Sequence, residues 1–161
     1  MKKQVIQINV KPKTSGEGGL PKTSIKKDLL IESGFMGDYN NFRTNKKSSD
    51  PKMAVLVLPI EIIHKLNKEG WPVNSGDLGE NLTTSGINNS DFSVGQQYKI
   101  GKSIIEITME CEPCKGLSYL DYVGETRVNN FIKTLVGRRG WYAKVLQAGL
   151  IERGDLILEK K

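Results

Sequence analysis

The stretch "IIEITMECEPCKGL" (Ile104–Leu117) joins a strand pattern to the two cysteines of the chain, Cys111 and Cys114. Apolar side chains recur at every second position from 105 to 109, which is the period of a β-strand with one buried face. Pro113 fixes the backbone just before Cys114, where we expect a helical turn to begin. The segment therefore predicts a strand that leads through a C-x-x-C motif into a helix.

Short strands and turns are predicted on both sides of this segment, together with two clear helices. Alternating or continuous apolar runs predict strands at 4–10, 28–31, 54–58, 82–84, 98–100, 141–146 and 156–159. Apolar stripes at helical spacing predict helices after Pro59, to about residue 69, and around 128–135. Residues 11–27 and 34–52 are expected to form long loops. This pattern predicts one α+β domain over residues 1–161, mainly β and β-barrel-like, with two or three helices.

The composition is that of an ordinary globular protein. The chain has 161 residues, 37% of them hydrophobic, and a formal net charge of +6. It contains no apolar run of bilayer-spanning length and no signal-peptide pattern, so we expect a cytoplasmic protein without a membrane partner. Its lysines are spread along the chain and are not interleaved with aromatic residues, which favours a solvated surface over nucleic-acid binding.

The C-x-x-C motif has several chemical interpretations. A structural zinc site usually needs four Cys or His ligands, and the chain offers two cysteines and one histidine, His64, on the polar side of a predicted helix. A thioredoxin-like redox pair would need a preceding βαβ unit, and Glu110 and Glu112 disfavour a thiolate between them. A single thiolate ligand at Cys114 would be favoured by the N-terminal dipole of the expected helix. Cys111, near the strand end, suits a buried, inert thiol.

Three further segments, read with "CEPCKGL", resemble a known family. They are "GFMGD" (Gly34–Asp38), "GDLGENLTTSGI" (Gly76–Ile87) and "GRRGWYAKVLQAGLIERGD" (Gly137–Asp155). Their order and spacing over residues 34–158 resemble the MOSC domain, found at the C-terminal end of molybdenum cofactor sulfurases and as small stand-alone proteins. The second and third segments are the most specific of the series.

The resemblance implies a β-barrel-like fold that binds a molybdenum-pterin cofactor (molybdopterin). It places the catalytic or metal-ligating cysteine, or the sulfur carrier, at Cys114. The implied activity is cofactor sulfur handling or the molybdenum-dependent reduction of small N-hydroxylated compounds. The alternative function is a non-catalytic carrier or a basic nucleic-acid-binding module without metal.

The sulfurases of this family contain a pyridoxal-phosphate domain that supplies sulfur. A chain of 161 residues has no room for that domain, so pyridoxal phosphate would act only in a separate sulfur-donor protein. The expected protein partners are therefore a cysteine desulfurase or a molybdoenzyme. Many relatives have arginine where this chain has Cys111, which leaves open a second thiol role such as resolving a persulfide on Cys114. Many also have histidine where this chain has Tyr39.

An anionic pterin cofactor needs cations and free N–H groups around its phosphate. We expect Cys114 to lie at a pocket mouth that Arg138 or Arg139 also faces. Glu80 and Asn81 would either bind the ligand or hold a turn through side-chain hydrogen bonds. The candidate cofactor-binding residues are Arg138, Arg139, Lys115, Arg43, Glu80 and Asn81.

Overall fold

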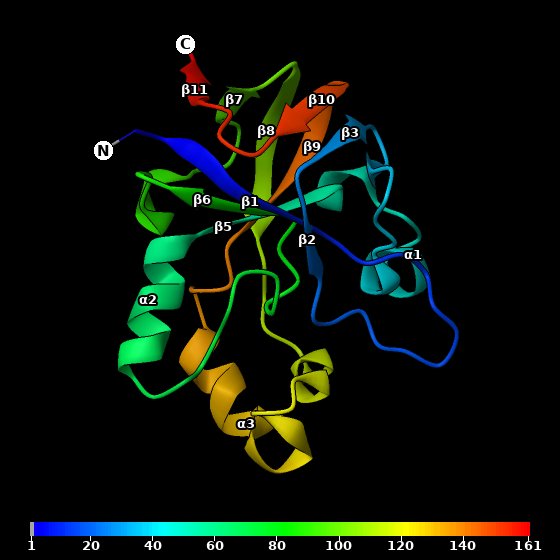
Figure 1. Cartoon of the computed structure of the whole chain (residues 1–161), viewed down its shortest axis with the longest axis vertical. Coiled ribbons are helices and arrows are strands. Elements are labelled where there is room, and N and C mark those ends of the chain that lie inside the picture. The colour runs from blue at the N-terminus through cyan, green and yellow to red at the C-terminus, as the bar shows by residue number, and fades with distance from the viewer. Residues whose placement is uncertain (1) are drawn as a thin grey trace.

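The computed structural model describes residues 2–161 and contains one large and one small β-sheet (Figure 1). Within the described residues the large sheet has eight strands in the order β11-β7-β8-β9-β5-β6-β1-β2. β5 and β6 are parallel, and the other neighbouring pairs are antiparallel. The strands are β1 (Gln4–Val10), β2 (Thr23–Ile25), β5 (Val55–Pro59), β6 (Leu82–Ser85), β7 (Gln97–Ile100), β8 (Ser103–Glu110), β9 (Trp141–Gln147) and β11 (Ile157–Lys160).

The small sheet has the order β10 (Gly149–Glu152), β3 (Lys27–Ile31) and β4 (Gly34–Phe35). In the large sheet, the start of β1 contacts the segment just before β11. Val5 N–H donates to the Asp155 carbonyl at 2.9 Å, and Gln4 and Leu156 form an isolated bridge. These contacts do not make a continuous ladder, so the sheet is not closed. The mainly β, α+β class is confirmed, whereas the barrel-like arrangement is not.

Three α-helices and three short 3-10 helices complete the described part of the chain. The α-helices are α1 (Asn41–Lys46), α2 (Ile60–Lys68) and α3 (Gly124–Leu135), and the 3-10 helices are η1 (Pro51–Met53), η2 (Asn89–Asp91) and η3 (Lys115–Tyr119). Figure 1 shows α3 at the lower end of the molecule, α2 above it at the left, and α1 at the right, beside the sheets. No helix in the described residues is long and apolar enough to cross a membrane.

Two apolar cores follow from these elements. In the sheet core, the alternation predicted for β8 is observed, because Ile105 and Ile107 are buried. A second core lies between α2, α3 and η3, where the rings of Trp71 and Phe131 are 4.4 Å apart. As predicted, α3 buries its apolar stripe, and Gly137 follows its end with a φ of +69°.

The predicted loops are only partly correct. Residues 11–27 include β2 and the first residue of β3, and residues 34–52 include β4, α1 and part of η1. These elements are short, and side-chain caps support two of them. Asn40 accepts a hydrogen bond from Arg43 N at 2.8 Å at the start of α1, and Asp50 accepts one from Lys52 N at 2.9 Å at the start of η1. Such caps stabilise helices that lack a long apolar stripe. β10 was also missed.

Candidate functional site

The two cysteines occupy different environments after the end of β8. Cys111 N–H donates to the Gly140 carbonyl at 2.9 Å, which fixes the residue beside the start of β9. Its side chain is buried in a small cluster with Met53, Leu56 and Tyr142. Cys114, by contrast, is partly exposed. Burial raises the pKa of the Cys111 thiol and keeps it protonated at neutral pH.

The helical turn predicted at Cys114 is present, but it is a five-residue 3-10 helix. Cys114 is its N-cap residue, and its carbonyl accepts from Leu117 N at 3.2 Å. Because so short a helix aligns few peptide dipoles, its N-terminus attracts negative charge only weakly, whereas the sequence predicted a stronger helix dipole at Cys114. A different group lies close enough to provide positive charge.

Arg139 supplies the cation next to Cys114. Its Nη1 donates to the Cys114 Sγ at 3.3 Å and to the Glu112 carbonyl at 3.0 Å, while its Nε donates to the Leu78 carbonyl at 3.3 Å. The side chain is only 8% exposed. Burial alone would lower the pKa of Arg139, but the two thiols and Tyr142 outweigh this effect and raise it. A charged guanidinium therefore lies within hydrogen-bond distance of the partly exposed Cys114 sulfur.

The neighbouring Arg138 lies elsewhere. It donates to the two carboxylate oxygens of Glu69 at 2.9 and 2.7 Å. It lines a separate recess of about 620 Å³ with Lys65 of α2 and Trp141 of β9. Gly137 and Gly140 flank the two arginines, and Gly140 has a φ of +85°. Its Cα packs against the carbonyl of Val57, where a side chain would clash.

A buried tyrosine and a second buried arginine extend the site from Cys111 toward α1. Tyr142 hydrogen-bonds the Cys111 side chain, and burial raises the pKa of the phenol. Arg43 is 7% exposed, and its Nε and Nη1 have no hydrogen-bond partner in the described part of the chain. Burial lowers the pKa of Arg43, while Asp38 and Tyr142 oppose this shift. Arg43 is thus a buried cation with two spare donors.

Glu80 holds the loop that also contacts Arg139. Its Oε1 accepts from Gly76 N at 2.6 Å and from Thr83 Oγ1 at 3.0 Å, and the side chain is fully buried. Burial raises the pKa of Glu80 to about 7. Leu78, two residues earlier, provides the carbonyl that binds Arg139. In this structure Glu80 therefore fixes a turn beside the site.

Asn81 joins β5, β1 and the motif residue Asp38. Its Oδ1 accepts from Leu56 N at 3.2 Å, and its Nδ2 donates to the Asn9 carbonyl at 3.2 Å and to Asp38 Oδ2 at 2.9 Å. Asp38 also pairs with Lys22 at 2.7 Å, and both side chains are almost fully buried. Lys22 was missed by the sequence analysis, although Asp38 belongs to the quoted "GFMGD" segment. Its sequence neighbourhood does not show that Asp38 is buried, and only a buried aspartate calls for a cation opposite it.

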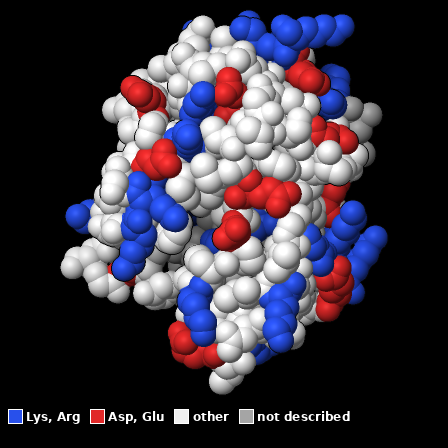
Figure 2. All heavy atoms as spheres, turned by 180° about the vertical axis from the view of Figure 1, so that it is seen from behind, with Lys and Arg blue, Asp and Glu red and all other residues white. Residues whose placement is uncertain are grey.

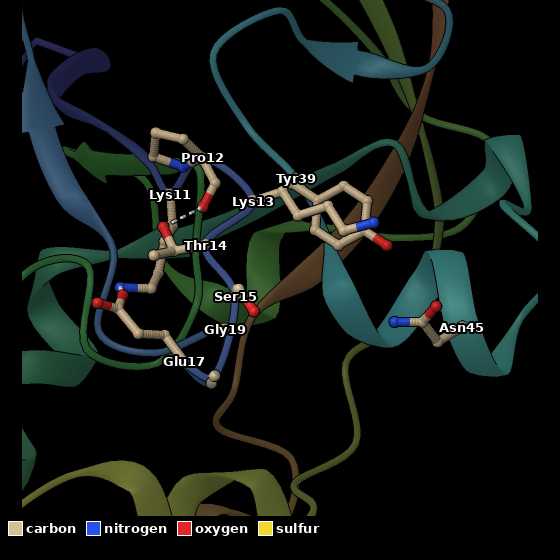
Figure 3. Close-up of a pocket in the computed structure, with 11 residues that line it drawn as sticks. Lys11, Pro12, Lys13, Thr14, Ser15, Glu17, Gly19, Tyr39 and Asn45 are labelled. Atoms are coloured by element: carbon tan, nitrogen blue, oxygen red, sulfur yellow. Dashed lines mark hydrogen bonds and ion pairs between the residues drawn. The ribbon is translucent and has the colours of Figure 1, made fainter.

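The remaining candidates lie at the surface. Lys115 is exposed at the start of η3. Tyr39 lines a small pocket of about 260 Å³ with Asn45 and the loop 11–19, as Figure 3 shows. Lys13 Nζ in this loop lies 5.1 Å from the centre of the Tyr39 ring. Tyr119 of η3 packs closely against Gly18, which brings the same loop to the segment that follows Cys114.

A zinc site does not emerge from this arrangement. Within residues 2–161, no group of three or more His, Cys, Asp or Glu side chains is placed to hold a metal ion. His64 is exposed on α2, as the sequence predicted. The described contact of the Cys114 sulfur is instead with one cation, the guanidinium of Arg139, and a single thiol of this kind can serve as a ligand for a soft metal.

The fold and this cysteine site define a known class of domain. A family model described as "MOSC domain" matches residues 44–158. The chain belongs to the MOSC domain family, as its sequence motifs predicted, and MOSC domains are associated with molybdenum-cofactor proteins.

Several proteins are similar to the chain. A Bacillus subtilis (strain 168) protein, YflK, is 25% identical over 86% of this chain and 61% of its own length. A Gibberella moniliformis protein named "Reductase" is 32% identical over 59% of this chain and 19% of its own length. The chain thus spans less than two thirds of either relative. The crystal structure of YiiM from Geobacillus stearothermophilus has the same fold, with a TM-score of 0.73, 24% identity and coverage of 99% of this chain and 75% of that one.

Proposed function

We propose that the protein binds a molybdenum-pterin cofactor with Cys114 as the thiolate ligand and uses it to reduce small N-hydroxylated compounds. The observation that carries this proposal is the partly exposed Cys114 sulfur, which lies 3.3 Å from the buried guanidinium of Arg139. A thiolate is a good ligand for a soft metal, and the adjacent cation favours the deprotonated form. The 32% identical protein named "Reductase" supports the choice of reaction.

The residues present fit such a group. Arg43 has two buried donors without hydrogen-bond partners, and such donors are costly to bury unless a ligand accepts from them. Tyr142 connects Arg43 with the cysteines electrostatically. Its phenol interacts with Arg43 and also with Cys111, Cys114 and Arg139. Cys114 would hold the metal, while Arg43 and the exposed Lys115 would complement the phosphate.

When bound, the cofactor supplies two-electron redox chemistry at its metal. The protein's own residues would bind the cofactor and orient its ligand, the Cys114 sulfur. Arg139 keeps the Cys114 sulfur in place by tying it to the carbonyls of Glu112 and Leu78. The buried cluster around Cys111 closes one side of the site to water.

Sulfur handling is a second candidate, favoured by the presence of a second thiol three residues away. Cys114 would then carry sulfur received from a separate cysteine desulfurase. A nucleic-acid-binding module is less well supported. On the face of the molecule drawn in Figure 2, behind that of Figure 1, acidic and basic side chains are interspersed and form no basic stripe.

The test is metal and persulfide analysis of protein purified from molybdate-replete cells. Wild type should contain molybdenum and pterin equimolar with protein, Cys114→Ser should contain neither, and Cys111→Ser should lose only part. A persulfide on Cys114 without metal would select sulfur handling. Wild type without either, or Cys114→Ser with normal loading, would refute the assignment of this site.

A further inference from the structure

Cys111 lies beside Cys114 but has no role in the proposed metal ligation. Its Sγ donates to the Glu112 carbonyl at 3.8 Å, and the same carbonyl accepts from Arg139 Nη1 at 3.0 Å. That nitrogen also donates to the Cys114 Sγ at 3.3 Å. The two sulfurs therefore flank one carbonyl and one guanidinium, and both are free thiols.

The two thiols differ in how easily a small oxidant reaches them. Cys114 is partly exposed, with its sulfur 3.3 Å from the Arg139 guanidinium, whereas Cys111 is 3% exposed and packs against Tyr142. An exposed cysteine next to a second cysteine is the usual arrangement of a reversible thiol oxidation site. Residues 111–114 also lie outside regular structure, between the end of β8 and η3. A side-chain movement there breaks no sheet or helix hydrogen bond.

We propose that Cys114 and Cys111 form such a site, in which a peroxide oxidises Cys114 and Cys111 converts the product to an intrachain disulfide. In the first step the Cys114 thiolate attacks one peroxide oxygen, the O–O bond breaks, and the released hydroxide takes a proton to become water. In the second step the Cys111 sulfur attacks the Cys114 sulfenic acid, and the S–O bond breaks. The Cys111 proton leaves with the hydroxyl group as a second water.

The disulfide would regulate the proposed cofactor site, and only this consequence rests on the proposed function. A sulfur bonded to Cys111 is no longer a thiolate and cannot bind a metal or accept a persulfide. Arg139 would lose its partner at Cys114 in the oxidised form. Reduction by a dithiol breaks the disulfide by exchange and returns both thiols.

The test uses fully reduced protein without cofactor, treated with stoichiometric hydrogen peroxide. Intact mass, free-thiol counting and non-reducing peptide mapping should show that wild type loses both thiols and the mass of two hydrogen atoms, within one chain. Dithiothreitol should restore it. Cys111→Ser should instead gain oxygen on Cys114, trapped by dimedone as the sulfenic acid, and Cys114→Ser should keep its thiol.

Cys111→Ala serves as a second variant if serine in the buried position prevents folding. Wild type that accumulates sulfenic acid on Cys114 as Cys111→Ser does, or a disulfide that joins two chains, would overturn the inference. The outcome is separable from the cofactor assignment. Disulfide formation in protein that never loads molybdenum would refute the proposed function alone, and normal loading without a disulfide would refute this inference alone.

Discussion

Replacing Arg139 with methionine should destabilise the fold and lower the reactivity of Cys114, whereas the same change at Arg138 should do neither. Methionine keeps an unbranched apolar stem but donates no hydrogen bond. It would leave the buried carbonyl of Leu78 and the partly buried carbonyl of Glu112 without the donors that now lie at 3.3 and 3.0 Å. An unsatisfied buried acceptor costs about 1–3 kcal/mol.

Part of that cost is offset, because the variant no longer buries a charge. We therefore expect the free energy of unfolding to fall by about 2–4 kcal/mol, which corresponds to a melting temperature lower by roughly 5–15 °C for a domain of this size. Loss of the guanidinium also removes the positive charge and the hydrogen-bond donor that lie 3.3 Å from the Cys114 sulfur. Alkylation of Cys114 by iodoacetamide at neutral pH should slow by roughly tenfold.

The assays are urea unfolding followed by circular dichroism and alkylation kinetics in a Cys111→Ser background. Arg138→Met is the matched control, because it removes an adjacent arginine whose ion pair with Glu69 is partly exposed and contributes little. Equal losses of stability in the two variants, or unchanged alkylation in Arg139→Met, would show that the contacts of Arg139 do not support the site.

Three other changes test the surroundings. Burial raises the pKa of Glu80 to about 7 from 4.5, so its contribution to stability is present below the lower value and lost as pH rises through the higher one. In the wild type, the free energy of urea unfolding should therefore fall by up to about 3 kcal/mol between about pH 5 and 8, and Glu80→Gln should abolish this fall. The same pH dependence in Glu80→Gln as in the wild type would contradict this account. Gly140→Ala should lower the free energy of unfolding by more than about 3 kcal/mol in the same assay, because the added Cβ would clash with the Val57 carbonyl. Gly137→Ala should lower it by only about 1 kcal/mol, because a Cβ added there has no other atom within 4 Å. Lys22→Met should cost about 3–5 kcal/mol by leaving Asp38 buried and unpaired, with partial recovery on adding Asp38→Asn, and additive losses would argue against the pair.

The sequence predicted the elements whose burial follows a simple period. β8 buries alternate residues, and α3 buries Val128, Phe131 and Leu135, because each packs one face on a core. The motif segments also identified the family. The hydrophobic pattern could not predict β4 or α1, because their lengths of two and six residues are too short to show a period. These elements depend on pairing with distant strands and on caps.

The contacts of the candidate site were less predictable for a related reason. Arg138 and Arg139 are adjacent and chemically identical, so no local pattern tells which one reaches Cys114. The answer depends on the course of the chain through Gly140, whose Cα packs against the Val57 carbonyl. The buried pair of Lys22 and Asp38 likewise joins residues sixteen apart in the chain. A pair of this kind needs the tertiary fold to bring its two partners together.

The source of the charge that acts on Cys114 decides how the site responds to change. A thiolate supported by a helix dipole would depend on the local structure of residues 115–119. Arg139 instead ties Cys114 to Leu78, 61 residues away from the arginine, and to Glu112, 27 residues away. Changes in the loop 76–80 should therefore alter the reactivity of Cys114 through Arg139. The buried arginine therefore acts on both parts of the site, because its charge lies beside the Cys114 sulfur and its donors hold the carbonyls of Leu78 and Glu112.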